Sequence, residues 1–276
     1  MTEPGLFQDD DVIRRITREG ILIASGGAAS VLQTSHPGVG QGVYDHSYTF
    51  KNPLARLQNT MEWLYAVQFG STEEAEIISS FARRMHDTVN GPDYDAQDAE
   101  PQVWVGATLF DVSLRFYQAL FGRLGPDEIE EFYQQTRVYA QLMGAPAEAQ
   151  PQDFAEFKVY YRKQLDSFEL TEASKKVAHQ LLYADRLPLY MRPGMGAIRL
   201  LTAGLMPEPL RTQYGWEWNA ARERRFIMLV NALRIVYPRL PLSVRTLPRE
   251  FYSRNIRKKV ERAKGRASRL SVRSSA

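Results

Sequence analysis

The chain has 276 residues, of which 44% are hydrophobic and 24% charged, so it is long enough to bury a sizeable core and has the composition of an ordinary globular protein. The absence of cysteine excludes disulfides, zinc–thiolate sites, iron–sulfur clusters and a thiolate-ligated haem. The formal net charge is only +3, and we expect no specific nucleic-acid partner.

The N-terminal segment has neither of the features that direct a chain to or through a membrane. Residues 1–10 carry three acidic side chains and no basic ones, unlike a signal peptide. The longest apolar stretch, residues 21–32, has about 12 residues, whereas a bilayer span needs roughly 20. We therefore expect no transmembrane span and a cytoplasmic protein.

The first predicted helix begins near Asp10 and continues to about residue 32. Paired glycines at positions 26–27 would weaken it by about 1 kcal/mol each relative to alanine. Glycine is favourable there only if a large group must approach the backbone, so we expect such a group at this point. Pro37 ends the helix, and the three glycines within residues 38–42 predict a flexible loop.

The next helix is predicted to begin at Asn52 and Pro53, which have the pattern of an N-cap followed by proline at the first helical position. Arg56 and Thr60 lie one turn apart on the same side of this helix. A guanidinium and a hydroxyl so placed can reach one ligand together, and they are equally expected as a capped pair at the surface.

A further helix carries the histidine of greatest interest. It opens with a capping-box pattern at residues 71–74 and ends at Gly91. His86 shares an apolar face of this helix with Ile78 and Val89. A histidine in this position is either a hydrogen-bonded core residue or a ligand that projects into a pocket.

The remainder of the chain also has helical periodicity, and no run of alternating β-branched residues predicts a strand. The most apolar of the later helices, at about residues 101–122, is expected to be central and buried on most sides. We therefore expect an all-α fold, with one multi-helix domain in residues 1–250.

Residues 251–276 differ from the rest of the chain in charge. They hold nine Lys/Arg and one acid, a net charge of +8, whereas residues 1–250 carry a net charge of −5. We expect the end of a basic helix followed by a disordered tail, which makes at most weak contact with anionic surfaces.

Residue spacing excludes most conventional active sites. Neither the Glu-x-x-His pairs of a di-iron bundle nor a His-Glu-x-x-His metal motif is present. The glycines of residues 38–42 lack the Lys-Ser/Thr of a phosphate loop, and there is no Gly-x-Ser-x-Gly elbow. A haem is compatible with the sequence, because it requires an axial imidazole on an apolar helix face and basic or hydroxyl groups for its propionates. His86 suits the first role, and Arg56 and Thr60 suit the second.

Several short motifs follow one another in a specific order. They are His36-Pro37, Tyr44-Asp45-His46-Ser47, Pro53-x-x-Arg56-x-x-x-Thr60, Met85-His86-x-x-Val89-x-Gly91, Trp104-Val105-x-Ala107-Thr108-Leu109 and Thr202-Ala203-Gly204-Leu205-Met206-Pro207. Together they resemble the MpaB-like oxygenases, a superfamily that also contains the latex-clearing proteins. The resemblance extends from about Asp10 to Pro248.

The resemblance implies a globin-related core that holds haem b, and an oxidoreductase that uses dioxygen to cleave carbon–carbon double bonds of an apolar, isoprenoid-like substrate. Carried over by position, His86 is the proximal iron ligand. Arg56 and Thr60 correspond to the conserved pair near the haem, and Thr108 corresponds to a threonine of the central helix.

The sequence departs from the family pattern at two positions. Gly106 stands where many members have histidine, and Asn59 stands where the latex-clearing branch has a lysine that can occupy the distal iron position. His46 and His36 are therefore the candidates for the distal side. The departure at Gly106 also supports an alternative function, a non-catalytic haem- or lipid-binding helical protein of the same fold.

Overall fold

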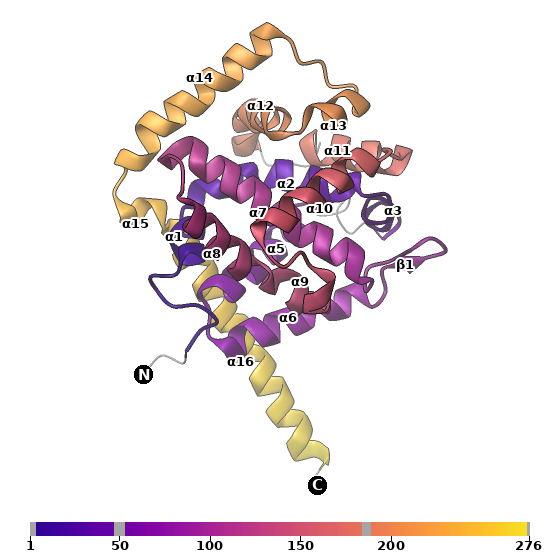
Figure 1. The fold of residues 1–276 in the computed structure, drawn as a ribbon. Helices are drawn as coiled ribbons and strands as arrows, with labels where there is room; N and C mark the ends of the chain where they lie inside the picture. The colour runs from indigo at the N-terminus through magenta and orange to yellow at the C-terminus, as the bar shows by residue number, and fades with distance from the viewer. Residues whose placement is uncertain (1–3, 47–52, 184–188, 275–276) are drawn as a thin grey trace.

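The computed structural model describes residues 4–46, 53–183 and 189–274. This part of the chain forms one all-α domain, as predicted, and its only strands are the two-residue β1 (Asn90–Gly91) and β2 (Tyr94–Asp95), which pair antiparallel (Figure 1). The α-helices are α1 (Val12–Thr17), α2 (Gly26–Ser35), α3 (Pro37–Asp45), α5 (Pro53–Phe69), α6 (Thr72–His86), α7 (Ala99–Phe121), α8 (Pro126–Thr136), α9 (Val138–Met143), α10 (Phe154–Ser167), α11 (Glu172–Leu182), α12 (Met195–Leu205), α13 (Glu208–Gln213), α14 (Ala220–Val236), α15 (Leu242–Arg245) and α16 (Leu247–Ser274). Short 3₁₀ helices are η1 (Gly20–Ser25), η2 (Ala147–Ala149), η3 (Leu189–Gly194) and η4 (Tyr237–Arg239). A globin-related core stays a prediction.

Helix α7 is the centre of the fold, as its apolar sequence predicts, and Figure 1 shows other helices on all sides of it. Trp104, Phe110 and Phe116 are completely or almost completely buried. The indole of Trp104 donates a hydrogen bond to the carbonyl of Leu32 at 3.0 Å, which fixes α7 to α2. The helix ends at Gly122, whose φ of 100° favours glycine.

The prediction of one long N-terminal helix is wrong, because the chain forms α1, η1 and α2 in succession. At Gly20 a side chain would lie 2.6 Å from Pro248, so the chain turns here against the start of α16. At Gly27 a Cβ would lie 2.5 Å from the hydroxyl of Thr202 on α12. The group that approaches Gly27 is therefore a neighbouring helix of the same chain, whereas no described atom lies within 4 Å of a Cβ at Gly26.

The prediction of a flexible loop at residues 38–42 is also wrong, since this segment is the helix α3. His36 is its N-cap and accepts a hydrogen bond from the Val39 amide, and proline occupies the first helical position. A Cβ at Gly40 would lie 2.3 Å from the Ser174 hydroxyl of α11, so tight packing on a neighbour outweighs the low helix propensity of glycine.

Helix α16 crosses the predicted boundary at residue 250 without a break. Ile256 and Val260 are buried in a cluster with Tyr65 and Ala66 of α5 and Ile78 of α6. The start of the predicted tail therefore packs against the helix that carries Arg56, while the division of the chain at residue 250 stays a prediction.

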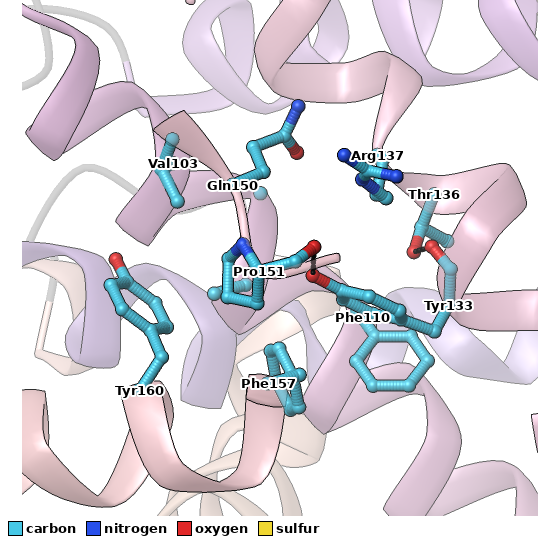
Figure 2. Close-up of a pocket in the computed structure, with 11 residues that line it drawn as sticks. Val103, Phe110, Tyr133, Thr136, Arg137, Gln150, Pro151, Phe157 and Tyr160 are labelled. Atoms are coloured by element: carbon cyan, nitrogen blue, oxygen red, sulfur yellow. Dashed lines mark hydrogen bonds between the residues drawn. The ribbon is translucent and has the colours of Figure 1, made fainter. Parts of the chain in front are cut away.

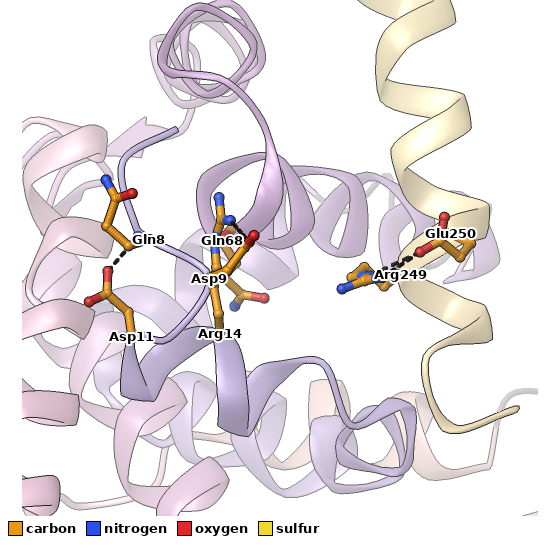
Figure 3. A network of polar contacts seen from close by, with 7 residues as sticks. All are labelled: Gln8, Asp9, Asp11, Arg14, Gln68, Arg249 and Glu250. Atoms are coloured by element: carbon orange, nitrogen blue, oxygen red, sulfur yellow. Dashed lines mark hydrogen bonds and ion pairs between the residues drawn. The ribbon is translucent and has the colours of Figure 1, made fainter. Parts of the chain in front are cut away.

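Helices α1, α5 and α16 meet at the C-terminal end of α5. Arg14 of α1 donates to the Gln68 carbonyl at 2.9 Å and pairs with Asp9 at 2.6 Å (Figure 3). The guanidinium groups of Arg14 and Arg249 both lie within 6 Å of the Phe69 ring centroid, at 5.8 and 5.6 Å. These contacts fix the orientation of α5 at its C-terminal end, opposite the end that carries Arg56.

Candidate functional site

The predicted site residues of α5 and α6 belong to one helix pair. The Trp63 indole of α5 donates to the Ser79 hydroxyl of α6 at 3.0 Å. The predicted capping box is present at the start of α6, where Ser71 and Glu74 exchange hydrogen bonds of 3.1 and 2.9 Å. With its start fixed in this way, α6 places His86 as its last residue.

His86 is half-buried, and the environment of its ring is unusual. Its Nδ1 atom is buried and has no hydrogen-bond partner among the residues that the structure describes. Burial, with the nearby charge of Arg56, lowers the pKa of His86 below its ordinary value of 6.5. The imidazole is therefore neutral at pH 7, with a buried nitrogen that no group of the described residues satisfies.

Arg56, in the first turns of α5, is close enough to His86 to depress its pKa. Burial also lowers the pKa of the Arg56 guanidinium, which nevertheless stays charged at neutral pH. Thr60, one turn further along α5, is exposed. The structure thus brings Arg56 and His86 together and places the Thr60 hydroxyl in solvent on the same helix.

His46 is the C-cap of α3, and its ring contacts the hairpin that follows α6. Its Nε2 atom lies 2.9 Å from the Tyr94 hydroxyl and 3.1 Å from the Asn90 carbonyl. Tyr94 donates its own proton to Asp45 at 2.9 Å, so it accepts the hydrogen bond from His46. The imidazole, the phenol and the carboxylate form a continuous series of hydrogen bonds between the end of α3 and the hairpin that follows His86.

The end of α3 also packs directly on the loop that leaves α6. A Cβ at Gly42 would lie 3.3 Å from both Val89 and the Tyr94 ring. The Val89 amide donates to the His86 carbonyl at 2.8 Å, which places this contact within one turn of the histidine. Segments 44 and more residues apart in the sequence therefore meet at the end of α6.

The other two predicted residues are engaged elsewhere. His36 donates a hydrogen bond from Nε2 to the Glu100 carboxylate at 2.5 Å, and its Nδ1 accepts from the Val39 amide and so caps α3. Both ring nitrogens therefore have partners. Thr108 is completely buried and donates to the Val105 carbonyl of its own helix at 2.8 Å. Within the described residues, no hydrogen bond, ion pair or ring contact connects His36 or Thr108 with His86.

Gly106 faces a small cavity of about 10 Å³ between α7, α8 and α10 (Figure 2). A Cβ at this position would be in ordinary contact with Ala140 of α9, at 3.7 Å. Arg137, Gln150 and Tyr160 also line the cavity, and each has a buried polar atom without a partner in the described part of the chain. A larger side chain at Gly106 would enter this cavity.

Sequence reasoning missed the partners of the two α3 histidines, namely Tyr94 for His46 and Glu100 for His36. Tyr94 belongs to the polar loop after His86, and Glu100 belongs to the first turn of α7. Both lie 48 or more residues from their histidine, so no local spacing predicts the pairing. The only signal in the sequence is the presence of polar residues in segments that flank buried helices.

In the described part of the chain, no group of three or more His, Cys, Asp or Glu side chains is suited to hold a metal ion. No helix there is long and apolar enough to cross a membrane. A single imidazole such as His86 is the kind of ligand that a haem iron needs, because the porphyrin supplies the remaining nitrogens.

Comparison with known proteins gives the family. Two uncharacterized proteins, one of Mycobacterium bovis and one of Mycobacterium tuberculosis, are each 25% identical over 221 residues, which cover 76% of this chain and 87% of the relative. No solved structure matches the chain significantly. The model of the family described as "ER-bound oxygenase mpaB/B'/Rubber oxygenase, catalytic domain" matches residues 13–235. This match covers most of the chain, which therefore belongs to that oxygenase family.

Proposed function

We propose that the protein is a haem b-dependent oxygenase that acts on an apolar, unsaturated substrate of isoprenoid type, with His86 as the proximal iron ligand. The observation that carries this proposal is the neutral, half-buried imidazole of His86 with its unsatisfied nitrogen, beside the cation of Arg56. Membership of the oxygenase family supports the reaction class.

The residues at the end of α6 fit a haem. A histidine must be neutral to offer a lone pair to an iron, and the depressed pKa of His86 meets this requirement. A buried nitrogen without a partner is energetically unfavourable, and coordination or a hydrogen bond formed on haem binding would relieve it. The cation of Arg56 suits a propionate carboxylate.

Bound haem would supply the redox chemistry that activates dioxygen towards an alkene. The polypeptide would supply His86 as the residue that holds the iron, Arg56 for charge compensation, and a hydroxyl from Thr60 one turn further along α5. We assign to His46 a catalytic role on the side of the hairpin. The hydrogen bonds from His46 through Tyr94 to Asp45 can hold or pass a proton there. Hydrogen bonds from Gln41 and Tyr94 lower the pKa of Asp45, so this series of hydrogen bonds ends in a carboxylate at neutral pH.

His36 and Thr108 have supporting parts in this proposal. The hydrogen bond of His36 to Glu100 fixes the start of α3, whose other end carries His46. Thr108 is part of the buried core of α7. Neither needs to contact the haem for the site to be complete.

The absorption spectrum of the purified protein, expressed with added haem precursor, tests the proposal. We expect a Soret band that is lost or strongly shifted in His86→Ala. His179→Ala is the matched control, because His179 is exposed on α11, and its spectrum should equal that of the unsubstituted protein. Absence of the band would contradict the haem proposal, and an unchanged band in His86→Ala would reject the ligand assignment.

Oxygen consumption separates the oxygenase from the alternative, a non-catalytic haem- or lipid-binding protein. A haem-loaded oxygenase should consume dioxygen when a soluble unsaturated isoprenoid is added, and should release carbonyl products. Haem binding without consumption across a series of chain lengths would favour the carrier.

A further inference from the structure

The last 57 residues of the chain are far more basic than the rest. Residues 220–276 hold sixteen Lys/Arg and three Asp/Glu, a net charge of +13, whereas residues 1–219 hold nineteen and twenty-nine, a net charge of −10. The asymmetry therefore begins well before the tail, at the start of α14. Most of this segment lies beyond residue 235, where the match to the family model ends.

Helix α14 combines this charge with exposed apolar side chains. It contains no fully buried residue, and it packs on α7 and α12 only through an inner row that includes Phe226 and Leu233. On its outer side Met228 is 69% exposed and Ile235 57% exposed. These two residues are seven apart and thus lie on one line of the helix, with Arg224 one turn before them.

The apolar surface continues from α14 into the start of α16. Five more large apolar side chains between the two helices and in the first two turns of α16 are more than a third exposed: Leu240, Leu242, Val244, Leu247 and Phe251. Figure 1 shows α14 and α15 along one edge of the molecule, with α16 continuing from that edge. We call this region, residues 220–258, the basic edge.

Many cations of the basic edge have no acidic partner. Arg245 pairs with Glu19 and Arg249 with Glu250. In the described part of the chain no carboxylate pairs with the following exposed residues: Arg224, Arg225, Arg234, Arg254, Arg257 and Lys258. Unpaired cations among exposed apolar side chains are typical of surfaces that lie in a membrane interface.

We propose that the basic edge docks the protein on the surface of an anionic lipid bilayer, with Met228, Ile235 and their apolar neighbours in the headgroup–acyl boundary and the arginines on the lipid phosphates. A nucleic acid would satisfy the cations but leave the apolar side chains in water. A second copy would bring together two surfaces of the same strong positive charge. Of these three, only an anionic bilayer matches both properties.

Docking through the basic edge is independent of haem binding, since the basic edge contains no residue of α5 or α6. It supplies a means of attachment to a bilayer that requires no spanning helix, and the structure has none among its described residues. It also assigns the binding surface to α14 and the segment up to α16, rather than to the extreme C-terminus.

Co-sedimentation of the full-length protein with vesicles tests the inference. We expect binding to phosphatidylglycerol/phosphatidylcholine vesicles, little binding to pure phosphatidylcholine, and weakening by salt. The apolar variant Met228→Ser/Ile235→Ser and the charge variant Arg224→Gln/Arg225→Gln/Arg234→Gln should each lower the affinity by about tenfold or more.

Helix α10 offers matched controls, because Lys158, Arg162 and Lys163 are exposed there and Val159 is 71% exposed. Lys158→Gln/Arg162→Gln/Lys163→Gln removes the same charge, and Val159→Ser removes an exposed apolar side chain, on a different face. Both controls should retain vesicle binding. An equal loss in the controls would contradict the assignment to the basic edge.

The absence of cysteine allows a direct measure of insertion. Met228→Cys and Val159→Cys, each labelled with an environment-sensitive fluorophore, report on the two faces separately. We expect a blue shift and greater intensity on anionic vesicles for the label at position 228 and no change at position 159.

Three results would overturn the inference. The first is failure of the full-length protein to bind anionic vesicles. The second is binding of an oligonucleotide duplex that the apolar variant leaves unchanged while the label at position 228 stays in water. The third is a dimer in light scattering that Met228→Ser/Ile235→Ser dissociates, which would make this surface a contact between two copies.

Discussion

His36 and His86 differ in whether their ring nitrogens have hydrogen-bond partners. Both are at a helix terminus, and both stand in motifs that predict a place near an iron. His36 has a partner for each ring nitrogen and pairs with Glu100 at 2.5 Å. His86 has a buried Nδ1 without a partner in the described residues, and a pKa lowered by burial and by Arg56. Because both histidines stand in motifs, the motifs alone do not identify the ligand, and the unsatisfied nitrogen makes His86 the candidate.

The largest effect is expected from His86→Ala. Loss of the axial imidazole should lower haem affinity by at least about a hundredfold, because even outer partners of a metal ligand contribute about tenfold to a hundredfold. The haem-to-protein ratio after gel filtration measures this loss. His36→Ala should keep the unsubstituted ratio, and an equal loss in both variants would remove the distinction between the two histidines.

Ile256→Ala should have the next largest effect, on stability rather than on the ligand. Ile256 is 1% exposed in the cluster that joins α16 to α5 and α6, so a cavity there should lower the free energy of unfolding by about 2–5 kcal/mol. Denaturant unfolding measures the change. Ile227→Ala, at a 47% exposed position on α14, is the matched control and should change stability by less than about 0.5 kcal/mol. Similar values for the two variants would show that α16 does not support the site helices.

His36→Ala should lower the free energy of unfolding by about 1–2 kcal/mol, because it removes the cap of α3 and the bond to Glu100. Thermal unfolding measures this loss. The position of any haem absorption band should stay unchanged. A shifted band would show that His36 acts on the iron site itself.

The smallest expected effect is a pH dependence of the melting temperature that arises from Glu100, the partner of His36. The hydrogen bond from His36 lowers the pKa of Glu100 below its ordinary value of 4.5. A depressed carboxyl pKa stabilises the folded state above the unfolded-state pKa, and this contribution is lost as the pH falls through the folded-state value. The difference in melting temperature between the unsubstituted protein and Glu100→Gln should therefore be present above about pH 5 and vanish in more acidic buffer. In the His36→Ala background it should be absent, and its persistence there would assign the shift to another group.

The elements whose signals are local could be predicted from the sequence. The capping box at Ser71 and the apolar run through Trp104 and Phe116 predict α6 and α7, and both are present. The predicted end of α6 at Gly91 is wrong, because the helix ends at His86 and Gly91 lies in β1. Local propensity failed where a neighbour decides the conformation. Gly40 is helical because α11 packs on it, and Gly27 contacts Thr202 of α12.

The site could be predicted only in part for the same reason. The helical position of His86 follows from the sequence, and so does the spacing of Arg56 and Thr60 on α5. The unsatisfied Nδ1, the approach of Arg56 and the chain from His46 to Asp45 depend on how α3, α5 and α6 pack. Spacing within one helix carries no information on contacts between helices.

The most direct test of the central claim is rescue of His86→Gly by free imidazole. The account predicts that the variant, reconstituted with haem, has an altered Soret band, and that added imidazole restores the band of the unsubstituted protein by occupying the vacated position. A variant whose spectrum already equals that of the unsubstituted protein without imidazole would contradict the account, because another group would then hold the iron.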